Sequence, residues 1–137
     1  MRRPVCVEEH CHLVVAVGDI VEASEGQVLP GAEHVEALLG FVRGWARERP
    51  LVIHCYAGIS RSTAAAFLSA CALAPHRSEA ENAAELRRAS PTATPNRRIV
   101  AVADDILGRQ GRMVDAIARI GRGRDAFAGE PFALRID

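Results

Sequence analysis

The chain has 137 residues, which is enough for one domain with a substantial core and too few for two. Its 17 basic and 17 acidic residues cancel, so the net charge gives no reason to expect nucleic acid or an anionic membrane as a partner. Every basic residue is an arginine, which codon bias in a GC-rich genome explains. We therefore predict a single globular domain over residues 1–137.

The N-terminal residues do not form a secretory segment, because Glu8, Glu9 and His10 interrupt any apolar region after the basic start. The longest apolar stretch, residues 64–74, is too short to cross a bilayer. The four cysteines lack the spacing of a disulfide framework. These features favour the reducing cytoplasm, with no membrane as a partner.

The first half of the chain alternates predicted strands with a helix. Residues 11–17 are apolar and β-branched and predict a strand, and residues 20–32, which contain glycine and proline, predict a loop. Over residues 33–48 the apolar side chains recur at helical spacing. Residues 51–53 form a short apolar run, which is typical of a fully buried parallel strand.

The sequence predicts two helices in the middle of the chain. Residues 62–74 have high helix propensity and stop before Pro75, which cannot continue a helix. Ser78 and Glu81 have the spacing of a capping box, so a second helix is expected to start there and to end near residue 89.

A last helical region follows Asn96, which is a good N-cap residue. Apolar residues at helical spacing continue over residues 99–120, with Gly108 and Gly111 as weak points. Alternation over residues 132–136 is compatible with a short edge strand. The order of strand, helix, strand, loop and further helices predicts an α/β unit completed by a helical cluster.

Residues 54–62, His-Cys-Tyr-Ala-Gly-Ile-Ser-Arg-Ser, connect the second predicted strand to the next helix, and we call them the Cys55 loop. Such a turn directs backbone N–H groups at one point, which favours an anion and moves a thiol towards the thiolate. Arg61 can hold two oxygens of an oxyanion, and Ser62 can donate a hydrogen bond to the Cys55 thiolate. The anion-binding residues that we predict are Tyr56, Ala57, Gly58, Ile59, Ser60 and Arg61.

The Cys55 loop follows the pattern His-Cys-x5-Arg-Ser and resembles the signature of the cysteine-dependent protein tyrosine phosphatase superfamily. Its Ala-Gly-Ile-Ser-Arg-Ser portion is most similar to the dual-specificity branch, in a bacterial form. Residues 90–96 and the following helix resemble the segment behind the loop in those enzymes, so the resemblance covers about residues 11–120. It implies a three-layer α/β fold, with a small parallel sheet flanked by helices, and a phosphatase that needs no metal or other cofactor.

The resemblance also assigns roles. It implies that Cys55 attacks phosphorus and forms a cysteinyl phosphate, that Arg61 and the loop amides hold the transferring group, and that His54 orients the loop. Phosphoinositide phosphatases of this superfamily often carry a lysine within the loop, and none lies between Cys55 and Arg61. This favours a phosphoprotein as the phosphorylated partner, and leaves a small metabolite or nucleotide open.

The family needs a general acid, normally an aspartate on a loop after an earlier strand. Asp19 is the sole aspartate before the Cys55 loop, and it lies where a predicted strand ends, 36 positions before the cysteine. One loop and one helix lie between them, which is enough chain to bring Asp19 back over the strand end. Asp19 is therefore the predicted acid, and Glu22 and Glu25 are alternatives on the same loop.

The resemblance implies further N-terminal strands, one of which normally flanks the strand that enters the signature. The chain starts too late to supply them, so we expect a sheet without the usual N-terminal strands. We favour a true N-terminus upstream of Met1. The alternatives are replacement of that strand by residues 1–10 and cover by a partner chain, and the sequence leaves the oligomeric state open.

Other functions compete with the phosphatase. A phosphate-binding module without turnover would keep the loop, and a sulfurtransferase of the rhodanese kind would also use Cys55. Cys6, His10, Cys11 and His12 match no closed zinc pattern, so we predict no metal, although Cys6 or Cys11 is a candidate for a reversible disulfide with Cys55. The C-terminal arginines interleave with aspartates and lack an aromatic platform, which favours a solvated helix face over a nucleic-acid site.

Overall fold

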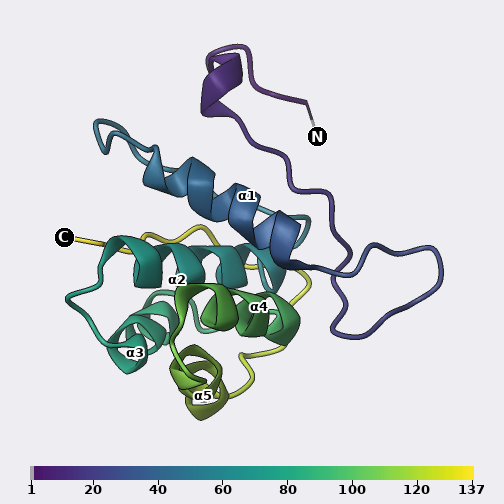
Figure 1. Cartoon of the computed structure of the whole chain (residues 1–137), viewed down its shortest axis with the longest axis vertical. Coiled ribbons are helices and arrows are strands. Elements are labelled where there is room, and N and C mark those ends of the chain that lie inside the picture. The colour runs from purple at the N-terminus through teal and green to yellow at the C-terminus, as the bar shows by residue number, and fades with distance from the viewer. Residues whose placement is uncertain (1) are drawn as a thin grey trace.

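The computed structural model describes residues 2–137, so Met1, the first residue of the predicted domain, lies outside the described residues. Within that range the regular structure is helical throughout (Figure 1). The elements in chain order are a 3-10 turn η1 (Glu9–Cys11) and the α-helices α1 (Ala32–Arg43), α2 (Arg61–Leu73), α3 (Glu79–Ala89), α4 (Arg97–Leu107) and α5 (Arg112–Ile120).

The predicted α/β fold is wrong, because the described part of the chain contains no β-strand and no sheet. Residues 11–17 and 51–53 run beside the helices without the ladder of hydrogen bonds that defines a strand. The Gly18 N–H donates to the Val28 carbonyl at 2.8 Å, which closes the loop between these residues and does not form a ladder. Residues 132–136, the candidate edge strand, are also irregular.

The apolar run that predicted a buried strand is buried on one side only. Leu51, Ile53 and Cys55 are half-buried, whereas Val52 is 79% exposed. Apolar and β-branched residues suit a pleated surface, but a strand also needs a neighbour in register, and no local pattern supplies one. The segment therefore keeps the two-residue alternation of burial that is typical of a strand, without pairing with another strand.

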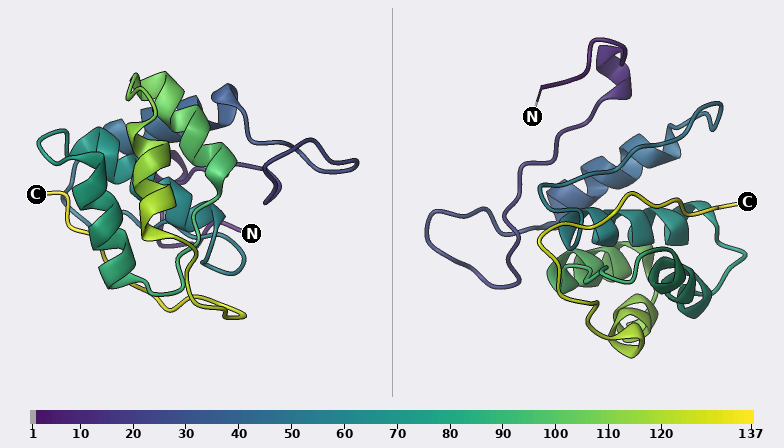
Figure 2. Two further views of the ribbon diagram at one scale, coloured as in Figure 1. Left: turned by 90° about the horizontal axis from the view of Figure 1, so that it is seen from below. Right: turned by 180° about the vertical axis from the view of Figure 1, so that it is seen from behind.

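α2 occupies the centre of the helical packing. α1, α3 and α4 pack against it, and α5 packs against α3 and α4 (Figure 2). Phe67, Leu68 and Cys71 of α2 are fully buried, and so are Thr63 and Ala64 in its first turn. Burial on most of its faces fixes this helix in the core, and with it the point where the Cys55 loop ends.

Local sequence signals located the helices well. In the predicted capping box the Ser78 Oγ accepts from the Glu81 N–H at 3.1 Å, and the Glu81 carboxylate accepts from the Ser78 N–H at 2.7 Å. The Asn96 Oδ1 caps α4 by accepting a backbone N–H at 3.0 Å. The helix predicted over residues 33–48 is shorter and ends at Arg43. No helix in residues 2–137 is both long and apolar enough to cross a bilayer.

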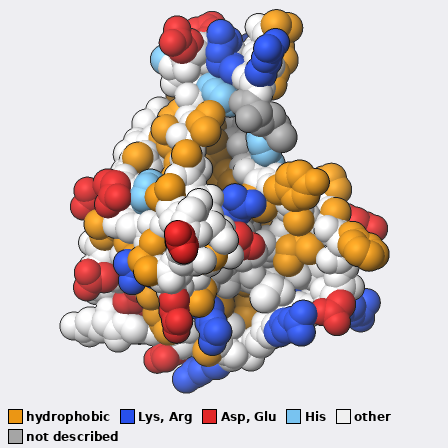
Figure 3. Space-filling model, turned by 90° about the vertical axis from the view of Figure 1, so that its right-hand side faces the viewer, with side chains coloured by type: hydrophobic (Ala, Val, Ile, Leu, Met, Phe, Trp, Pro, Cys, Tyr) orange, Lys and Arg blue, Asp and Glu red, His pale blue; other side chains and the backbone are white. Residues whose placement is uncertain are grey.

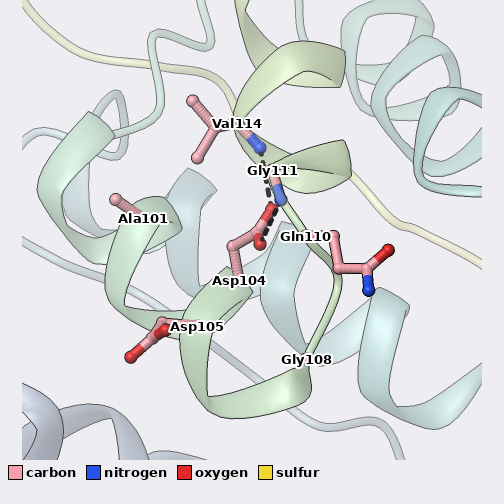
Figure 4. Close-up of a pocket in the computed structure, with 7 residues that line it drawn as sticks. All are labelled: Ala101, Asp104, Asp105, Gly108, Gln110, Gly111 and Val114. Atoms are coloured by element: carbon pink, nitrogen blue, oxygen red, sulfur yellow. Dashed lines mark hydrogen bonds between the residues drawn. The ribbon is translucent and has the colours of Figure 1, made fainter.

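The helical region predicted over residues 99–120 is interrupted at the two glycines named as weak points, and forms the separate helices α4 and α5. Gly108 and Gly111 have φ of 65° and 86°, which favours glycine. Asp104, 4% exposed, accepts from the Met113 N–H at 2.7 Å. It also accepts from the N–H groups of Gly111 at 2.8 Å and Val114 at 3.3 Å, both drawn in Figure 4. Its carboxylate thus satisfies the free donors that begin α5.

We predict that Asp104→Ala lowers the free energy of unfolding by about 2–3 kcal/mol, because it leaves several N–H groups at the start of α5 without their acceptor. Urea denaturation monitored by circular dichroism measures the change. The control is Asp105→Ala, which alters the exposed neighbouring carboxylate and is expected to change stability by less than about 0.5 kcal/mol. Equal losses in the two variants would contradict this role.

Candidate active site

The Cys55 loop leads directly into α2, whose first residue is Arg61. Gly58 has φ of 71°, a left-handed conformation that lets the chain turn around the sulfur. The Cys55 Sγ accepts from the Gly58 N–H at 3.3 Å and lies 3.2 Å from the Ser62 Oγ, within hydrogen-bond distance. The loop therefore surrounds the sulfur with donors, as the sequence predicted for a thiolate.

These donors act on the pKa of Cys55. Burial is the largest single influence and raises this pKa, but the Ser62 hydroxyl and the N–H groups of Ser62, Gly58 and Ile59 together outweigh it, so the pKa lies below its ordinary value. Cys71 shows the opposite balance, since burial in α2 raises its pKa to about 12. Cys55 is thus the cysteine whose surroundings stabilise the nucleophilic form.

Two carbonyl groups of the loop accept hydrogen bonds from α2 and from the segment before α4. The Ile59 carbonyl accepts from the Thr94 N–H at 2.9 Å and from the Thr63 hydroxyl at 2.5 Å. The Ser60 carbonyl accepts from the Asn96 N–H at 3.1 Å. Because the C=O and N–H of one peptide group point in opposite directions, these bonds fix the direction of the Ser60 and Arg61 N–H groups.

Arg61 is held against the segment that was predicted to be the first strand. Its Nη1 donates to the Val17 carbonyl at 3.1 Å. Its Nε is buried and has no hydrogen-bond partner among residues 2–137. A buried donor without a partner costs free energy, and an oxyanion held by the guanidinium would remove that cost.

Asp19 is the acidic residue that the structure brings to the Cys55 loop. Its Oδ1 accepts from the Ser60 hydroxyl at 2.7 Å and from the Asn96 side-chain amide at 2.9 Å. The Asn96 amide also donates to the Ile20 carbonyl at 3.1 Å, which holds the backbone next to Asp19. Glu22 and Glu25, the alternative acids, are exposed and make no side-chain hydrogen bond within the described part of the chain.

Two predicted site residues have little contact with the rest of the site. His54 is exposed, and its side chain makes no hydrogen bond within residues 2–137, so its orienting role stays a prediction. Tyr56 is 94% exposed beside the loop. The side chains of Ala57 and Ile59 are half-buried, and these residues contribute to the loop through their backbone.

Sequence reasoning missed several contributors to this site. Asn96 was expected only as a helix cap, and its side-chain contact with Asp19 was not foreseen. Thr63, Thr94 and the Val17 carbonyl were not considered either. The position of Asn96, directly before a helix that packs on α2, is a signal that could have pointed to it. Carbonyl and N–H groups are present in every residue, so Val17 and Thr94 leave no signal in the sequence.

Two alternative kinds of site were considered from the sequence, a metal site and an arginine-rich nucleic-acid surface. Within residues 2–137 no group of three or more His, Cys, Asp or Glu residues is placed to hold a metal ion. On the face drawn in Figure 3 the arginines lie among acidic side chains. Comparisons with protein-family models, curated proteins and solved structures found no match.

We predict that Ser62→Ala raises the pKa of Cys55, because it removes a hydrogen bond to the thiolate. At a pH below the titration midpoint, alkylation of Cys55 by iodoacetamide should be about tenfold slower, as expected for one bond to a charged group. Mass spectrometry of the peptide that contains Cys55 separates this thiol from the exposed Cys6 and Cys11.

The control for this measurement is Ser69→Ala, which removes another buried hydroxyl of α2. Ser69 donates to the Ala65 carbonyl at 2.7 Å and is not among the groups that bond Cys55. Its loss is expected to leave the pH dependence of Cys55 alkylation unchanged. An unchanged rate in Ser62→Ala as well would show that the hydroxyl does not act on the thiolate.

Proposed function

We propose that this protein hydrolyses phosphomonoesters through a cysteinyl-phosphate intermediate, in the manner of the dual-specificity protein tyrosine phosphatases that its Cys55 loop resembles. One observation carries the proposal: a thiol of lowered pKa and a carboxylate from a distant segment are both hydrogen-bonded to the same loop. A nucleophile, an oxyanion site and a proton donor are the three elements that metal-free phosphoryl transfer requires.

In the first step the Cys55 thiolate attacks phosphorus, an S–P bond forms, and the bond to the ester oxygen breaks. Asp19 in its protonated form gives its proton to the departing oxygen, so an alcohol or phenol leaves. Arg61 and the loop N–H groups bind the phosphoryl oxygens, whose charge they stabilise in the transition state. The unpaired Nε of Arg61 supports this assignment, since it is a donor that the folded protein does not use.

In the second step water attacks phosphorus and the S–P bond breaks. The Asp19 carboxylate, left ionised by the first step, accepts a proton from the water. The Ser62 hydroxyl, 3.2 Å from the sulfur, donates a hydrogen bond to the departing thiolate and makes it a better leaving group. Phosphate is released, and the thiolate and the carboxylic acid are restored.

A phosphoprotein is the substrate class that we propose. The loop has no lysine between Cys55 and Arg61, so it lacks the extra positive charge that suits phosphoinositides. The exposed Tyr56 ring beside the loop offers an apolar surface to a substrate side chain. In a substrate screen that includes small phosphorylated metabolites, we expect the highest kcat/KM for phosphopeptides.

The first test is hydrolysis of p-nitrophenyl phosphate. We expect vanadate-sensitive turnover in the wild-type protein and its loss in Cys55→Ser, because a serine hydroxyl is not ionised by this loop. Cys71→Ser, which alters the buried cysteine of α2, is the control and should retain turnover where it folds. Phosphate binding without turnover would identify a binding module, and thiosulfate sulfurtransferase activity would identify a rhodanese-like enzyme.

The second test concerns Asp19. Asp19→Asn keeps the shape of the side chain but cannot donate a proton to the leaving oxygen, so kcat for an alkyl phosphate should fall by about 10²–10⁴-fold with little change in substrate binding. An aryl phosphate with a good leaving group should be affected less. Glu22→Gln is the matched control. A larger fall in kcat in Glu22→Gln than in Asp19→Asn would show that Glu22 is the general acid.

A further inference from the structure

The segment after α5, residues 121–129, returns to the Cys55 loop, although the proposed reaction makes no use of it (Figure 2). The Gly123 N–H donates to the Thr94 hydroxyl at 3.1 Å. The Arg124 N–H donates to the Pro91 carbonyl at 2.9 Å. The Gly129 N–H donates to the Ala57 carbonyl at 2.7 Å, so the segment ends in direct contact with the loop.

The peptide group that Gly129 contacts is one of those that donate to the Cys55 sulfur. Its carbonyl, from Ala57, accepts from Gly129, and its N–H, from Gly58, donates to the Cys55 Sγ at 3.3 Å. The C=O and N–H of a trans peptide point in opposite directions, so a bond that holds the carbonyl also holds the N–H. Glycine at 58 makes this peptide group the easiest in the loop to rotate, because glycine tolerates both signs of φ.

The C-terminal segment approaches the Cys55 loop so closely that position 129 requires glycine. A Cβ atom at position 129 would lie 2.5 Å from the Gly58 carbonyl oxygen, a backbone atom that a side-chain rotation cannot move away. A side chain at 129 would therefore push the segment and the loop apart. The Gly129 hydrogen bond and the direction of the Gly58 N–H thus depend on the same contact.

We propose that Gly129 is a positioning residue for the nucleophile: the C-terminal segment 121–129 keeps the Gly58 N–H directed at the Cys55 sulfur and so helps to hold Cys55 as the thiolate. The proposal rests on the proposed function only in taking Cys55 as the nucleophile. It assigns an influence on the reactive sulfur, exerted through the Gly58 N–H, to a residue that lies 74 positions from Cys55 in the sequence.

The chain offers a matched control in the same segment. A Cβ atom at Gly123 would lie 2.5 Å from the Ala93 carbonyl oxygen and equally close to the carbonyl carbon and oxygen of Thr92, so its clash with backbone is larger than that at Gly129. Gly123 makes no hydrogen bond to the peptide group that faces Cys55. A general disturbance of the segment should appear in Gly123→Ala and Gly129→Ala alike, whereas an effect on the thiolate should appear only in the second.

The experiment measures alkylation of Cys55 by iodoacetamide against pH in full-length wild type, Gly129→Ala and Gly123→Ala, read by mass spectrometry of the Cys55 peptide. We expect the midpoint to move to higher pH in Gly129→Ala alone, with alkylation about three- to fivefold slower below the midpoint. An equal shift in both variants, or no shift in a folded Gly129→Ala, overturns the proposal.

Alkylation needs no turnover, so this outcome is independent of phosphatase activity. A shift confined to Gly129→Ala in a protein that does not hydrolyse phosphate esters would support the positioning role and reject the proposed function. Where Gly129→Ala fails to fold, the wild-type protein gives the answer by NMR. The chemical shifts of the Gly58 and Gly129 amides should then change with pH at the same midpoint as Cys55, and that of Gly123 should not. A Gly129 chemical shift that does not follow the titration of Cys55 overturns the proposal.

Discussion

The candidate site depends on Asn96, a buried residue that joins three parts of the molecule. Its Oδ1 caps α4, and its backbone N–H bonds the Ser60 carbonyl of the Cys55 loop. Its side-chain amide donates both to Asp19 and to the Ile20 carbonyl. With 4% of its surface exposed, Asn96 exchanges few of these bonds for water, so the orientation of α4, the loop and the Asp19 segment are set together.

The bonds around Asn96 explain how a nucleophile loop is held without a sheet. In the expected fold, the entry to the loop would have been a strand held in a small parallel sheet. Here the loop carbonyls of Ile59 and Ser60 are bonded by the segment before α4, and the first turn of α2 is enclosed by other helices. The pKa of the Cys55 thiol is lowered, against the effect of burial, by the Ser62 hydroxyl and by the N–H groups of Ser62, Gly58 and Ile59.

The sequence predicted the helices better than the sheet, for a physical reason. Ser78 with Glu81, Asn96 and the glycines after α4 mark helix ends through bonds made within a few residues, so a local pattern contains the whole signal. A strand is made by a partner elsewhere in the chain. Residues 51–53 have the composition of a buried strand, but no neighbour pairs with them in the described residues, and Val52 faces outward.

The same distinction holds within the site. Cys55 and Arg61 were predicted because both lie in one short motif, and Asp19 because no other aspartate precedes it. Its contact with the loop fits that choice. The backbone donors of Thr94 and Gly129 could not be predicted, since an N–H group is not specific to any residue type and only the fold decides where it points.

The unpaired Nε of Arg61 has a consequence for the balance between folding and ligand binding. A donor buried without an acceptor makes the ligand-free protein less stable than its contacts would otherwise allow. If the proposed oxyanion supplied the acceptor, that free energy would be returned as binding affinity, and only in the folded state. On the proposed function, folding and anion binding would therefore be thermodynamically linked through one nitrogen atom, and a variant that satisfied this donor with one of its own groups would be more stable and bind the anion less tightly.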